Sequence, residues 1–270
     1  MMIGIDSSAQ EGIESSYQRK NSFFFQWGYN RANYQDTDIH FKGEGFDFTI
    51  RNVSAHDEPT PFSSDIYLNP LKMTIPQFNF RVGWFINERT SISLGWDHMK
   101  YVMESYQRIR IEGDVSEDFS EEFAGSYFNQ KFDTSPSFLK FEHTDGLNYV
   151  RLGIERHTPV WNNQNKTLSV DAIIGASMGP VFTWTDATIN GRRYENWLHC
   201  AGAGVSGQLA LQVRFKNSLF IQYQHQSGYI QLGDIIFMED ESRASQEIVF
   251  SEQSIVIGAQ LPIFIGKNPN

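Results

Sequence analysis

The sequence is poor in three features that would each point to a particular class of protein. It has a single cysteine, Cys200, so no internal disulfide can form. It has no apolar run near the ~18 residues that a membrane-spanning helix needs. Its 22 basic residues are outnumbered by 32 acidic ones, and this formal charge of −10, without a basic stripe, argues against a nucleic-acid partner. Residues 1–20 lack the apolar core of a secretory signal peptide, so we expect either a mature form or a misassigned start.

What the sequence does contain is a repeated alternation of apolar and polar side chains. In residues 78–86 one face carries large apolar side chains, whereas the other carries Asn79 and Arg81. Residues 209–215 and 255–261 repeat the pattern. A strand has a period of two residues, so the two sets point to opposite sides of a sheet. Aromatic residues make up 14% of the chain, and this abundance together with the alternation predicts an all-β fold: a single closed transmembrane β-barrel, apolar outside and polar inside.

Turn chemistry fixes the expected number of strands. Short polar turns are predicted at 87–90, 162–166 and 216–218, and long surface loops at 104–136, 187–197 and 235–246. The count is eight, and it places both chain ends on the periplasmic side. The strands are predicted at 22–34, 76–86, 91–103, 138–161, 168–186, 198–215, 218–234 and 247–264.

Residues 39–41 and 46–50 also alternate, and we predict that they form a hairpin above the membrane, because one more spanning strand would make the count odd. A ten-stranded barrel, with an extra strand within 55–75, is the alternative. The domain boundaries expected are a disordered periplasmic lead-in at 1–20, the outer-membrane barrel at 21–264 and a short tail at 265–270.

The face assignment predicts a polar lumen. An eight-stranded barrel has an interior just wide enough for side chains to fill, so inward charges should pair with one another and form a plug. Aromatic side chains near the short turns should form a girdle at the membrane interface. The lumen network is predicted to contain Arg81, Asp97, Arg151, Glu155, Asp171 and Arg214, with Gln208, Gln212, Gln222, Gln224 and Gln260, and the girdle Trp84, Trp161, Phe215 and Phe220.

Four sequence blocks, 23–32, 38–43, 93–103 and 138–149, resemble a family of uncharacterised outer-membrane β-barrel proteins of Bacteroidota. The resemblance covers most of the chain from residue 21 onward. It implies a location in the outer membrane of a Gram-negative bacterium. It implies no activity, because that family has no established one.

A set of polar residues on and after one lipid-facing strand suggests a catalytic site. His225 and Ser227 continue the outward face of the strand, and Glu239 follows Ser227 by 12 positions in the next loop. This set resembles the triad of the outer-membrane lipid A 3-O-deacylases, which implies His225 as general base, Ser227 as nucleophile and Glu239 as the acid that holds the tautomer. The chain departs from that family at Gly228, where the family has Asn.

Three functions follow from these observations. The preferred one is a non-enzymatic outer-membrane barrel whose extracellular loops bind a partner protein or a glycan, possibly within a larger envelope complex. The alternatives are a lipid A ester hydrolase and a small-solute channel. We expect outer-membrane lipid and lipopolysaccharide as partners, together with other envelope proteins, and neither a cofactor nor a metal ion nor nucleic acid.

Overall fold

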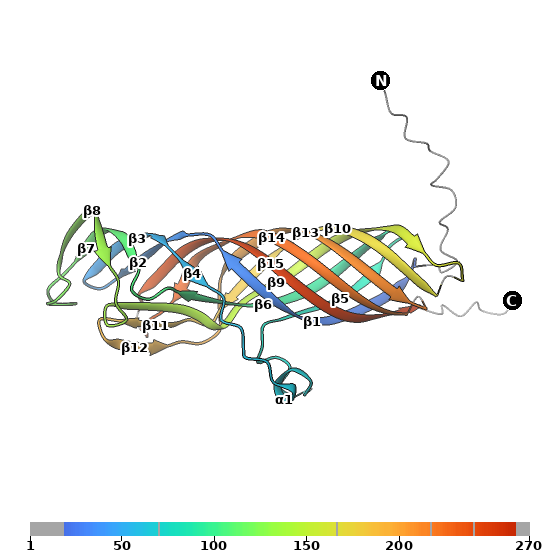
Figure 1. The fold of residues 1–270 in the computed structure, drawn as a ribbon. Helices are drawn as coiled ribbons and strands as arrows, with labels where there is room; N and C mark the ends of the chain where they lie inside the picture. Colours follow the sequence, from blue (N-terminus) through green and yellow to red (C-terminus); the bar gives the residue numbers. More distant parts are fainter. Residues whose placement is uncertain (1–18, 70, 166, 217, 240, 263–270) are drawn as a thin grey trace, which may run out of the picture.

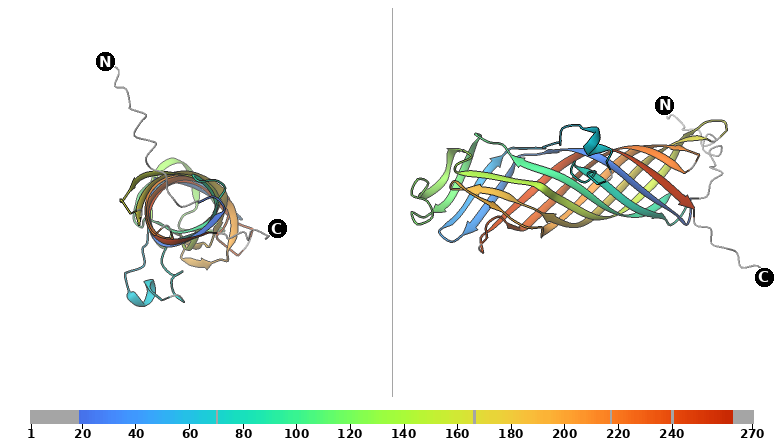
Figure 2. Two further views of the ribbon diagram at one scale, coloured as in Figure 1. Left: turned by 90° about the vertical axis from the view of Figure 1, so that its right-hand side faces the viewer. Right: turned by 90° about the horizontal axis from the view of Figure 1, so that it is seen from below.

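Eight long strands close into one antiparallel ring, in which each strand pairs with the next and the first pairs with the last. The computed structural model describes residues 19–262 apart from positions 70, 166, 217 and 240. Figure 1 shows the barrel from the side, and Figure 2 shows the closed ring end-on. In ring order the strands are β1 (Ser22–Tyr34), β5 (Phe78–Phe85), β6 (Thr90–Met103), β9 (Leu139–Asn162), β10 (Leu168–Thr183), β13 (His199–Phe215), β14 (Leu219–Ile236) and β15 (Arg243–Pro262).

The eight predicted strands are therefore confirmed, and the ten-stranded alternative is wrong. Among the described residues of 55–75, the regular elements are the two-residue strand β4 (Ala55–His56) and the short helix α1 (Ser64–Tyr67). They leave the ring as an excursion along its outer side (Figure 2), because prolines such as Pro59 and Pro61 cannot donate to a sheet ladder. No helix within the described residues has the length and apolar character needed to cross a membrane.

One end of the barrel has short turns and the other has further strands. Ser22 pairs with Pro262, so β1 begins and β15 ends at the turn end. At the other end three hairpins extend the wall into a dome, visible on the left of Figure 1. The dome consists of β2 (Thr37–Gly43), β3 (Phe46–Val53), β7 (Arg108–Val115), β8 (Gly125–Asp133), β11 (Asp186–Ile189) and β12 (Arg192–Glu195).

Two of the three predicted long loops are instead hairpins of the dome, whereas the hairpin predicted within 39–50 is present. Residues 104–136 hold β7 and β8, and residues 187–197 lie largely in β11 and β12. The third connection is short, since β14 runs to Ile236 and β15 begins at Arg243. Ile109 and Ile111 are buried while Arg110 between them is exposed, so the period-two pattern simply continues beyond the ring strands.

The polarity of the wall inverts along the barrel axis, as β14 illustrates. Near the turn end its outward residues are the exposed Leu219 and Ile221, and its inward residue Gln222 is buried. Near the dome the inward residues are the buried Ile230 and Leu232. An apolar outer belt around a polar interior suits lipid, whereas a polar exterior around an apolar core suits water. The inversion therefore marks where the wall leaves the membrane.

The predicted lead-in and tail lie largely outside the described residues, which omit 1–18 and 263–270. Arg19 is the exception. Its side chain is buried inside the turn end of the barrel, where Nη2 lies 2.6 Å from Oδ2 of Asp171. Arg19 therefore contributes a side chain to the interior of the turn end.

Candidate functional site

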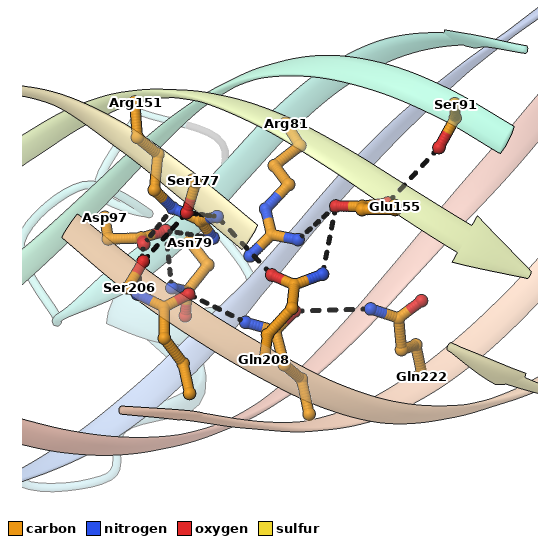
Figure 3. Close-up of polar contacts among 12 residues, drawn as sticks. Asn79, Arg81, Ser91, Asp97, Arg151, Glu155, Ser177, Ser206, Gln208 and Gln222 are labelled. Carbon is orange, nitrogen blue, oxygen red and sulfur yellow. Dashed lines mark hydrogen bonds and ion pairs between the residues drawn. The ribbon is translucent and has the colours of Figure 1, made fainter. Parts of the chain in front are cut away.

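The interior of the membrane belt is filled by ion pairs between strands. The guanidinium of Arg81 on β5 reaches Glu155 on β9 at 2.8 Å, and Arg151 on β9 reaches Asp97 on β6 at 2.5 Å. All four side chains are at most 5% exposed. Figure 3 shows the two pairs side by side, joined through the amide of Gln208, which donates to Glu155 and accepts from Arg151. Because these side chains are buried, removing either member of a pair would leave an uncompensated charge inside the barrel and destabilise the fold.

A further carboxylate, Asp171 on β10, accepts from two arginines at the turn end. Arg214 lies 2.8 Å from it and Arg19 lies 2.6 Å from it. The structure thus places all six predicted charged lumen residues inside the barrel and pairs them with inward partners. Two further charged residues, Arg19 and Glu252, also lie inside the barrel. No pattern in the polar residues before β1 indicated Arg19. Glu252 could have been predicted, because it has the same parity along β15 as the inward Ser254 and Val256.

The lumen contains equal numbers of guanidinium and carboxyl groups. Among the described residues that line the belt interior, four guanidinium groups face four carboxyl groups. Asn79 links the carboxyl groups of Asp97 and Glu252, with its Nδ2 2.7 Å from an oxygen of each. Gln222, Gln224 and Gln226 form a ladder that ends on Asp97. The arrangement is a cross-linked plug that holds opposite walls together.

Apolar groups close the barrel at both ends of this plug. At the turn end Phe24, Phe85 and Phe220 form a small buried cluster, so the prediction that Phe220 belongs to the girdle is wrong. The reason is its register: Phe220 lies between the outward Leu219 and Ile221 and therefore points inward. The remaining predicted girdle residues, Trp84, Trp161 and Phe215, are 38%, 50% and 46% exposed on the outer wall.

At the dome end the lumen is closed by an aromatic core. Phe41 of β2 packs against Phe141 of β9 and against Phe237, which follows β14, with ring centroids 5.4 Å and 5.3 Å apart. All three side chains are fully buried. Side chains from opposite walls thus meet at the centre of the dome.

The predicted catalytic set lies on the outer wall and is only partly assembled. Ser227 Oγ is 3.3 Å from Nε2 of His225, and both side chains are exposed. Glu239 is in the turn beyond Ile236, and eleven residues of strand separate Ile236 from His225, which is roughly 35 Å at ~3.3 Å per residue. Glu239 cannot orient the imidazole, so the predicted triad is wrong in its acid. The loop does not fold back because β14 and β15 stay paired up to Ile236 and Arg243.

The other reactive groups form no centre in the described part of the chain. Cys200 is exposed. No group of three or more histidine, cysteine, aspartate or glutamate side chains among the described residues is arranged to hold a metal ion.

Comparison with known proteins gives similarity at the level of architecture. The sequence matches no known protein-family profile and has no significant match among curated proteins. Among solved structures it is similar to the outer membrane protein OprG from Pseudomonas aeruginosa, with 8% identity, a TM-score of 0.43 and coverage of 91% of this chain and 98% of that one. It is also similar to Ail, the attachment invasion locus protein of Yersinia pestis, with 9% identity, a TM-score of 0.34 and coverage of 90% and 99%.

The chain is a single transmembrane β-barrel. The closed ring, the apolar outer belt and the polar interior together require this fold. The resemblances to the Bacteroidota family and to the deacylases stay predictions.

Proposed function

We propose that this protein is a non-enzymatic outer-membrane barrel whose dome binds a glycan or a protein outside the cell. The observation that carries the proposal is the filled interior, which has a plug of ion-paired and hydrogen-bonded side chains within the belt and an aromatic core in the dome. With the interior closed, the surface that distinguishes this barrel is the dome. The short turns indicate the periplasmic end, so the dome faces outward.

A polar groove at the base of the dome favours a glycan. It has a volume of about 790 Å³ and lies between β2, β3, β14 and β15. Asp38 and Glu247 supply carboxylate acceptors, Gln231 supplies an amide, and Tyr229 offers an aromatic ring at the membrane side. Sugars present hydroxyl groups to such donors and acceptors and C–H faces to aromatic rings. Arg51 bonds Asp38 at 2.8 Å, which fixes one wall of the groove in advance.

The free edge of the dome sheet favours a protein as the second candidate. Within the described part of the chain the sheet order ends at β8, which pairs with β7 on one side and with no strand on the other. Its residues are mostly exposed, and Phe128 is 84% exposed. An exposed edge strand can accept a strand from another chain by backbone hydrogen bonds.

The two alternative functions have less support. A solute channel requires a continuous opening, whereas Phe41, Phe141 and Phe237 meet across the dome. A serine esterase requires an acid beside the base, and Glu239 lies too far along the chain from His225.

A glycan array read with purified, fluorescently labelled protein tests the proposal. We expect selective binding that Gln231→Ala and Glu247→Gln each reduce, and that Gln130→Ala, a matched exposed position on β8, leaves unchanged. Planar-bilayer recordings should show no unitary conductance. Glycan binding that is unchanged in both groove variants would contradict the proposal that the groove binds the glycan. Steady conductance would contradict the proposal that the barrel interior is closed.

A further inference from the structure

A second groove lies on the outer wall of the membrane belt, beneath the excursion that carries α1. It has a volume of about 750 Å³. One side is the barrel wall of β1, β14 and β15, and the other side is Tyr67, Leu68 and Met73 of the excursion. Tyr67 is held against the wall by Tyr29, whose hydroxyl donates to the carbonyl of Tyr67 at 2.6 Å and whose ring lies 4.7 Å away.

The lining of this groove changes from apolar to polar along its length. Trp27 pairs with Ile257, Tyr29 pairs with Ile255, and Arg31 pairs with Gln253, in that order toward the dome. The end toward the turns is therefore apolar, and the end toward the dome carries a cation and an amide. An amphipathic molecule placed with its chain toward the turns matches this gradient.

The polar end continues around the wall as a row of exposed side chains. Gln253 is the direct cross-strand partner of both Arg31 and His225. Directly opposed side chains in a sheet lie about 4.5–5.5 Å apart at Cβ, so the three groups can act on one ligand. Polar and ionisable side chains in a membrane-spanning segment are costly, so such a residue suggests a functional site. His225 and Ser227 thus have an explanation that does not need a catalytic triad.

The excursion places this groove at the surface of the lipid. Its apolar side chains Phe62, Leu68 and Leu71 are 80%, 76% and 91% exposed. Exposed apolar groups on a short segment beside a barrel wall are stable where they enter the interfacial layer of the membrane. Figure 1 shows the excursion at mid-length on the barrel side, between the turn end and the dome.

We propose that this groove binds a phosphorylated lipid of the leaflet that faces the dome. The lipid phosphate contacts Arg31, Gln253 and His225, and an acyl chain lies along Trp27, Ile255 and Ile257 beneath Leu68 and Met73. Charge complementarity selects the anion, since guanidinium groups bind phosphate through paired hydrogen bonds. Asp57 acts electrostatically on Arg31, but its carboxylate already accepts hydrogen bonds from the backbone N–H of Ala32 and the side chain of Gln77.

Native mass spectrometry of the full chain, released from detergent micelles, tests the proposal. Dioleoyl phosphatidate and dioleoylglycerol have the same acyl chains and differ in the phosphate. We expect a one-to-one complex with phosphatidate at least tenfold tighter than with dioleoylglycerol, because hydrogen bonds to charged groups contribute that much. Arg31→Gln should remove most of this preference, and Arg156→Gln, an exposed arginine on β9 outside the groove, should leave it intact.

A second pair of variants tests the acyl chain. Ile255→Trp narrows the groove and should weaken phosphatidate binding several-fold, whereas Ile174→Trp, on the exposed wall of β10, should not. Both keep an apolar residue in the lipid belt, and heat-modifiable gel migration verifies that each barrel is folded. Equal binding of the two lipids, equal losses for both arginine variants, or no effect of Ile255→Trp would overturn the proposal. Displacement by millimolar inorganic phosphate, or an Arg31-dependent dimer seen by light scattering, would also overturn it.

Discussion

Breaking one ion pair of the plug should destabilise the barrel more than the loss of a surface ion pair would. In Arg81→Met the guanidinium that lies 2.8 Å from Glu155 is replaced by an apolar chain of similar length. The remaining carboxylate is 5% exposed and would lie inside the barrel without its cation. Removing one partner of a buried pair typically costs about 3–5 kcal/mol. Glu155 keeps hydrogen bonds from Gln208 and Ser91, so we expect the lower part of this range, about 3 kcal/mol.

Urea unfolding in lipid vesicles, followed by tryptophan fluorescence, measures this loss. For a urea m-value of ~3 kcal/mol/M the midpoint should fall by about 1 M. Arg108→Met is the matched control, because Arg108 and Asp133 are 2.7 Å apart but 66% and 67% exposed on the dome. Exposed pairs contribute little, so its midpoint should stay near that of the parent chain.

The double variant Arg81→Met/Glu155→Leu decides whether the loss comes from the unpaired charge. Replacing a whole buried pair by apolar groups is often neutral or stabilising, so the double variant should be more stable than Arg81→Met. A double variant less stable than the single one, or an Arg81→Met midpoint equal to that of the Arg108 control, would show that the unpaired carboxylate does not cause the loss.

Three other perturbations follow from the same contacts. Phe237→Ala should lower the unfolding free energy by about 3–5 kcal/mol, since the ring is fully buried in the dome core, and urea titration would measure it. Gly202→Ala should impair folding, because its Cβ would lie 1.9 Å from the carbonyl oxygen of Gln231, whereas Gly233→Ala meets no atom within 4 Å and should fold normally in a gel-shift assay. Hydrogen bonds from His40 and then Lys42 lower the pKa of Asp47 in the folded protein. The ionised carboxylate therefore stabilises the β2–β3 hairpin above the pKa of an unfolded aspartate, about 4, and this stabilisation is lost as pH falls from there through the lowered pKa of the folded state. Amide exchange of the hairpin would follow the loss.

The sequence predicts the barrel well because one simple regularity governs it. Each ring strand must place lipid-facing and lumen-facing residues alternately, so Val82 and Arg81 already reveal their sides. The same regularity places both Arg81 and Glu155 inside the barrel, whereas their pairing depends on the strand register, which the sequence pattern does not reveal. It also predicts that Phe220 is inward, and its assignment to the girdle followed from nearness to a turn and ignored the alternation.

The dome is harder to predict because its apolar residues point inward, whereas the apolar residues of the membrane belt point outward. In β7 the apolar Ile109 and Ile111 are inward, whereas in β14 the apolar Leu219 and Ile221 are outward. Alternation alone does not distinguish a strand that faces lipid from one that faces a water-soluble core. The pairing of β15 with β2, at Arg243 and Lys42, joins the part of the dome formed by β2, β3, β7 and β8 to the ring, and this contact spans about two hundred residues of sequence.

The error over Glu239 has a related physical origin. Twelve residues of loop could return a carboxylate to Ser227, but most of the residues after Ser227 are strand, and a strand extends by about 3.3 Å per residue. The pattern of β14 favours strand to Ile236, since Ile230, Leu232 and Ile235 supply the inward side of the dome core. The residues that bury the dome are therefore the ones that carry Glu239 away from His225, and the polar wall around His225 is left facing lipid, where an anionic headgroup can meet Arg31.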